Sequence, residues 1–152
     1  MKGFKLLGFS YSPGYSDMRG GSHSVSLEQD KDGAWTMTFR DRESYGSPTS
    51  VAVYSVPEGS VGVFEIFLEK SRVLSLEKRP KSTVFATDYS PWSYSADYEK
   101  TVFGKTKRYQ CRITEYRLYT KRDRRLIDEL REQFMFLKGS MISETEEEDV
   151  QD

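Results

Sequence analysis

Basic and aromatic side chains alternate between Lys105 and Arg125, and this combination has the chemistry to bind an anion. Arg108 and Arg112 share one face of a predicted strand, opposite Tyr109 and Cys111. Three more arginines crowd the first turn of a predicted helix, where cations oppose the helix dipole unless an anion is bound there. The candidate anion- or nucleic-acid-binding residues are therefore Arg108, Arg112, Arg122, Arg124 and Arg125, and the candidate base-stacking rings are Tyr109, Tyr116 and Tyr119.

Two similar segments rich in tyrosine and serine form a second candidate site. Residues 10–17 and 88–98 both contain Tyr-Ser-Pro followed shortly by Tyr-Ser. Tyrosine and tryptophan offer a large contact area with few rotatable bonds, and serine adapts its hydrogen bonds to a partner. These segments predict a protein-binding surface made by Tyr11, Tyr15, Tyr89, Trp92 and Tyr94. The alternative is that the rings fold back to complete a core that is short of aliphatic side chains.

Motifs for catalysis and for metal binding fail on inspection. Gly104-Lys105-Thr106 resembles the end of a Walker A loop, but the first glycine of that motif would fall at position 99, which is a glutamate. His23 and Cys111 are the only histidine and cysteine, too few for a zinc site built from these ligands. No catalytic residue, metal or cofactor is therefore predicted. An enzyme that uses carboxylates around the glycine-rich segment Asp17–Ser22 remains a weaker alternative.

The formal net charge of −1 conceals a strong segregation of charge along the chain. Residues 100–125 contain ten lysines and arginines against two acids, whereas residues 140–152 contain six acids and no base. The acidic segment has too little apolar surface to offset its chain entropy, so it is expected to be a disordered tail. That tail either competes within the same chain for the basic face or serves only solubility. The basic side chains either bind an anion or form ordinary solvated faces of the strand and helix.

Length and composition limit the protein class. A chain of 152 residues fits one domain, placed at residues 1–139 with the tail at 140–152. A single cysteine favours a reducing, cytoplasmic compartment. No apolar run approaches the roughly 20 residues of a membrane-spanning helix, and the N-terminal residues do not form the apolar core of a signal peptide.

The elements that position these residues follow from hydrophobic periodicity. Alternating patterns predict strands over residues 4–11, 23–29, 34–42 and 109–118, with a bulge near residue 114 or 115 and a four-residue hairpin turn at residues 30–33. Residues 49–56, which are apolar on both faces, and residues 83–87 are predicted to form two further strands. Residues 88–98 are expected to form a loop. Helical spacing predicts helices over about 56–71, with a capping box that begins at Ser55, and about 121–138, with Thr120 as N-cap and Gly139 at the end. The predicted fold class is α+β, an antiparallel sheet of about five to six strands covered on one face by the two helices.

The sequence favours a small non-enzymatic binding module that contacts a protein partner through the Tyr/Ser-rich loops and the basic strand-helix segment. The alternative function is a nucleic-acid-binding domain that uses residues 105–125, with the acidic tail as an internal competitor.

Overall fold

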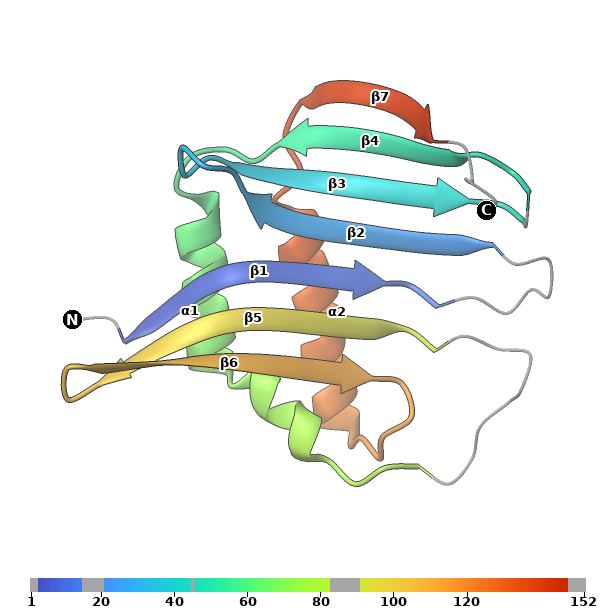
Figure 1. Ribbon diagram of the computed structural model, residues 1–152. Helices are drawn as coiled ribbons and strands as arrows, with labels where there is room; N and C mark the ends of the chain where they lie inside the picture. The colour runs from blue at the N-terminus through green and yellow to red at the C-terminus, as the bar shows by residue number, and fades with distance from the viewer. Residues whose placement is uncertain (1–2, 15–20, 45, 83–90, 148–152) are drawn as a thin grey trace.

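The computed structural model describes residues 3–14, 21–44, 46–82 and 91–147. Within these ranges, the chain forms one seven-stranded antiparallel sheet in the order β6-β5-β1-β2-β3-β4-β7 (Figure 1). The strands are β1 (Phe4–Ser12), β2 (Ser22–Gln29), β3 (Trp35–Arg42), β4 (Thr49–Ser55), β5 (Ser93–Val102), β6 (Lys105–Thr114) and β7 (Met141–Glu147). The antiparallel sheet and the two helices are confirmed, but the seven described strands exceed the predicted five to six and make the chain mostly β.

Two helices and a 3-10 helix cover one face of the sheet. They are α1 (Ser60–Ser71), α2 (Lys121–Met135) and η1 (Val73–Lys78), and Figure 1 shows them all on the same side. The core lies between these layers, where the Phe9 ring packs against the rings of Phe64 and Phe134 at centroid distances of 5.1 and 4.8 Å. Because Phe64 belongs to α1 and Phe134 to α2, this aromatic cluster packs both helices against the sheet.

The β2–β3 hairpin forms as predicted. One carboxylate oxygen of Asp30 accepts hydrogen bonds from the amides of Asp32 and Ala34, and Gly33 takes a φ of 86° that favours glycine. The predicted N-cap of the second helix is also present, because Thr120 and Asp123 form a capping box at the start of α2.

The first helix begins later than predicted, and the Ser55 capping box is wrong. Gly59 is the N-cap of α1, with no side-chain cap. The Ser55 hydroxyl donates to the carbonyl of Ser140 and accepts from the amide of the same residue. Ser55 therefore ties β4 to the segment that follows α2, and its hydroxyl is not used to cap a helix.

The acidic C-terminal segment departs most from expectation. Residues 141–147 form the edge strand β7, antiparallel to β4, where we expected a disordered tail. All seven side chains of β7 are exposed, so backbone hydrogen bonds to β4 hold a strand whose composition shows no hydrophobic pattern. The sheet thus continues past the expected boundary at Gly139, and residues 148–152 lie outside the described residues.

The other corrections concern the segment between the two helices. Ser93–Val102 forms β5, an interior strand between β6 and β1, although its serines and tyrosines suggested a loop. The predicted bulge near Thr114 or Glu115 is not found, because β6 ends at Thr114. Register shifts among the described strands occur between Leu6 and Gly8 and between Val53 and Tyr54. The strand predicted at residues 83–87 falls outside the described residues.

Candidate functional site

The tyrosines expected to face a partner are instead core residues, where the structure describes them. Tyr11 and Tyr94 are 9% and 1% exposed, and their rings stack at 4.5 Å. Arg131 donates a hydrogen bond to the Tyr94 hydroxyl, and Trp92 is half-buried against the same ring. The prediction of a contact surface is therefore wrong for Tyr11 and Tyr94, because strand alternation directs both rings toward the helices. Tyr15 and Tyr89 lie outside the described residues.

The five candidate arginines do not form one surface. Arg108 and Arg112 are exposed on β6, whereas Arg122, Arg124 and Arg125 are exposed on α2, behind the sheet in Figure 1. Arg108 is already paired, because its guanidinium donates two hydrogen bonds to the carboxylate of Asp97 on β5. The candidate stacking ring Tyr119 packs on Trp92 and donates its hydroxyl hydrogen to the carbonyl of Thr114, while Tyr116 is half-buried.

The anion predicted at the start of α2 is part of the chain. Asp123 is 5% exposed and accepts from the Thr120 amide at 3.0 Å and from two nitrogens of Arg79 at 2.8 and 3.1 Å. These hydrogen bonds, led by the one from Arg79, lower the pKa of Asp123 from 3.8 to about 2. An internal carboxylate therefore occupies the helix end where the sequence suggested a site for a phosphate or carboxylate.

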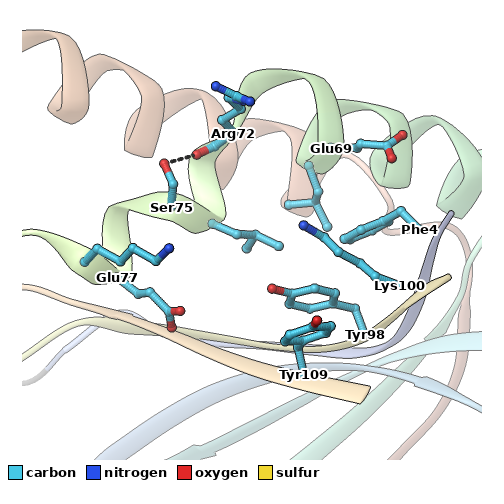
Figure 2. A pocket seen from close by; sticks show the side chains of 11 residues that line it. Phe4, Glu69, Arg72, Ser75, Glu77, Tyr98, Lys100 and Tyr109 are labelled. Carbon is cyan, nitrogen blue, oxygen red and sulfur yellow. Dashed lines mark hydrogen bonds between the residues drawn. The ribbon is translucent and has the colours of Figure 1, made fainter. Parts of the chain in front are cut away.

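A groove lies on the helix side of the sheet, between α1, η1 and the strands β1, β5 and β6 (Figure 2). Its volume is about 680 Å³, in the range of known binding sites. Three stacked rings form its floor: Tyr98 lies 5.0 Å from Phe4 and 5.5 Å from Tyr109. Charged residues of both signs also line the groove, namely Glu69, Arg72, Glu77, Lys78 and Lys100.

The turn between α1 and η1 shapes the far wall of this groove. Arg72 takes the left-handed conformation, at φ 60° and ψ 24°, which is uncommon for a residue other than glycine. Its carbonyl accepts hydrogen bonds from the amide and from the hydroxyl of Ser75, and Figure 2 shows the bond from the hydroxyl. This tight turn directs η1 onto β6, where the Cys111 thiol donates to the carbonyl of Leu74.

The near wall is the edge of the sheet, because β6 pairs with β5 alone among the described strands. The β5–β6 turn consists of Phe103 and Gly104, both with positive φ. In a two-residue turn of this kind the flanking residues, Val102 and Lys105, form a hydrogen-bonded pair. Pairs with and without backbone hydrogen bonds then alternate along the two strands. Thr106, Arg108 and Gln110 therefore direct their backbone groups away from β5. The next residue with an outward amide is Arg112, and this amide donates a hydrogen bond to the carboxylate of Glu77.

The open part of this edge, Lys105–Gln110, is exposed throughout and adjoins the aromatic floor through Tyr109. Lys107 lies directly opposite Lys100, so two like charges meet beside the groove and repel each other. A partner with negative charge would relieve that repulsion. The arrangement thus offers unpaired backbone groups, an aromatic floor and local positive charge within one region.

The thiol in this region is inert. Burial raises the pKa of Cys111 to about 12, and His23 lies on β2, which β5 and β1 separate from β6 in the sheet. Among the described residues, no three His, Cys, Asp or Glu side chains are placed to hold a metal ion. In the same part of the chain, no helix is both long and apolar enough to cross a membrane.

Comparison with protein-family models, curated protein sequences and solved structures finds no match for this chain. The groove was missed at the level of sequence because it needs β5. Tyr98 and Tyr109 are eleven residues apart, and only the hairpin between them brings their rings together. The alternation of Tyr94, Ala96 and Tyr98 was the available signal for that strand.

Proposed function

We propose that the protein is a non-enzymatic binding module that captures an extended segment of a protein partner along the open edge of β6. The observation that carries the proposal is the exposed edge Lys105–Gln110 beside the aromatic floor, which no other described strand covers. An added strand would hydrogen-bond to the outward backbone groups, and every second side chain would project toward the groove. Six residues of edge correspond to about 20 Å of partner strand.

The chemistry of the edge specifies the kind of segment. Lys105 and Lys107 share the helix side of β6 with Tyr109, and Lys100 stands on the neighbouring strand. A segment that places an apolar or aromatic side chain over Tyr109 and acidic side chains beside these lysines would complement both features. Electrostatic attraction would mainly accelerate association and select the partner.

A protein segment fits the geometry better than a nucleic acid. The candidate arginines lie on two separate elements, the edge strand β6 and the helix α2 behind the sheet, and this division does not favour one continuous phosphate backbone as the ligand. Arg108 is engaged by Asp97, and the ring of Tyr109 already stacks on Tyr98. The acidic strand β7 lies at the opposite edge from β6, which argues against competition of its glutamates for the basic strand of the same molecule. The cytoplasm stays our proposed compartment, on the single cysteine alone.

The test is a selection from a displayed library of random decapeptides, followed by titration of the selected peptides against single-site variants. Gln110→Pro removes an outward amide but no hydrogen bond to β5, so it should abolish binding and leave the fold intact. Gln110→Ala is the matched control and should bind like the original chain. Tyr109→Ala should weaken binding at least about tenfold, whereas Tyr109→Phe, which keeps the stacked ring, should not.

Two results would overturn the proposal. One is equal binding of peptides by the Gln110→Pro and Gln110→Ala variants, because edge pairing would then play no part. The other is tight, salt-dependent binding of a labelled single-stranded oligonucleotide at ~50 mM salt with no peptide selected, which would establish the nucleic-acid alternative.

A further inference from the structure

The two free edges of the sheet carry opposite charge. Within the described residues, β6 and β7 are the terminal strands of the sheet (Figure 1). The edge strand β6 contains four bases and no acid, and β7 contains three acids and no base. These side chains are Lys105, Lys107, Arg108 and Arg112 on β6, and Glu144, Glu146 and Glu147 on β7.

The charges also project on matching faces. Glu144 pairs with Ala52, which pairs with Phe39, and Phe39 packs against the core, so Glu144 and Glu146 project on the helix side. Lys105 and Lys107 project on the same side, because they lie four and two positions before Tyr109, whose ring lines the groove on the helix side. When two sheets join with their helices on the same side, lysines and glutamates therefore meet.

Strand direction permits that continuation. Six antiparallel steps separate β6 from β7, so the two strands run in the same direction, as their arrows in Figure 1 show. A second copy that keeps the same orientation would place its β7 parallel to β6 of the first. Both strands are exposed along the contact, over Lys105–Gln110 and Met141–Glu147.

We infer that the strand captured by β6 is β7 of a second copy of this chain, in a head-to-tail contact that extends the sheet from one molecule to the next. This inference rests on the proposed function, because it names the occupant of the same edge. Contacts between two β6 edges or between two β7 edges oppose like charges and are disfavoured. The contact is heterologous, so it does not close by itself and the number of copies rises with protein concentration.

The experiment measures the weight-average mass of the full chain by sedimentation equilibrium at several concentrations and salt levels. At ~100 µM protein and ~20 mM salt, the mass should exceed the monomer value of 17.6 kDa, rise with concentration, and fall to the monomer value in ~0.5 M salt. Lys105→Glu with Lys107→Glu should give monomers, and so should Glu144→Lys with Glu146→Lys. The matched control, Arg124→Glu with Arg125→Glu, changes the same charge on α2 and should still associate.

An equimolar mixture of the two edge variants should regain the higher mass. The acidic β6 of one variant can then pair with the basic β7 of the other. The milder pair Glu144→Gln with Glu146→Gln keeps the shape of β7 and should weaken association at least about threefold. The inference is overturned if the original chain is monomeric at low salt, or if association persists unchanged in both edge variants. A mixture that remains monomeric would also overturn it.

The same variants separate this inference from the proposed function. The Glu144→Lys, Glu146→Lys chain keeps an unaltered β6, so it should still bind a selected peptide. Peptide binding by this variant, together with a monomeric original chain, would refute the second copy as partner and leave strand capture intact. Loss of peptide binding in the original chain and in every variant would refute strand capture itself.

Discussion

The ion pair at the start of α2 should account for a measurable share of the stability of the protein. The carboxylate of Asp123 is nearly inaccessible, caps the helix through Thr120 and receives two hydrogen bonds from Arg79. Its pKa falls from 3.8 to about 2, which corresponds to about 2 kcal/mol of folding free energy at neutral pH. The substitution Asp123→Asn keeps the shape of the side chain and removes the charge, so it should cost about 2–3 kcal/mol at pH 7.

The contribution of Asp123 to the free energy of unfolding should depend on pH. The pKa of Asp123 is lower in the folded than in the unfolded chain, so its contribution is complete above about pH 5 and disappears as the pH falls toward 2. The difference between the original chain and Asp123→Asn should therefore shrink to about half at pH 3.

Urea unfolding followed by circular dichroism at pH 7 and pH 3 measures both quantities. Asp128→Asn is the matched control on the same helix, because Asp128 is exposed and lies 3.7 Å from Arg131, and it should cost less than about 0.5 kcal/mol. A cost for Asp123→Asn equal to that of the control, or a cost that does not change between the two pH values, would refute the reasoning.

Three further predictions follow from close packing and burial. Gly139→Ala would place a Cβ atom 2.5 Å from the carbonyl oxygen of Ser55, so it should destabilise the pairing of β7 with β4 by about 1–3 kcal/mol. Hydrogen exchange of the β7 amides should therefore accelerate, and an unchanged exchange rate would contradict the close approach. Phe134→Ala, at a fully buried position, should destabilise the fold by about 3–5 kcal/mol in thermal unfolding, and a cost below about 1 kcal/mol would show that the core is elsewhere. The Cys111 thiol, with its pKa raised to about 12, should not react with a disulfide reagent at pH 8 until the protein is unfolded, and rapid reaction of the folded chain would show that it is exposed.

Several elements were predictable because their signals are local. The Asp30–Gly33 turn, the capping box at Thr120 and the periodic face of α2 each depend on residues a few positions apart. The side chains and backbone atoms that stabilise them are therefore visible within a short window of sequence. The α+β class followed from these same patterns.

The errors occurred where distant segments determine the outcome. Ser55 looks like a helix cap in its own neighbourhood, yet its hydroxyl binds Ser140, 85 residues away. The β5 segment resembles a loop in composition, but pairing with β1 on one side and β6 on the other makes it an interior strand. Strand β7 has an acidic composition typical of disorder, and the edge of β4 orders it through backbone hydrogen bonds that are insensitive to side-chain type.

The candidate site shows the same division. The sequence by itself determined the segregation of charge, the abundance of tyrosine and the absence of familiar catalytic and zinc motifs. Only the tertiary structure decided which tyrosines are buried, that Asp123 occupies the anion position at α2, and that bases and acids lie on opposite edges of one sheet. The physical reason is that strand pairing joins residues far apart in the chain, so neither the free edges nor the faces of a sheet can be read from a local pattern.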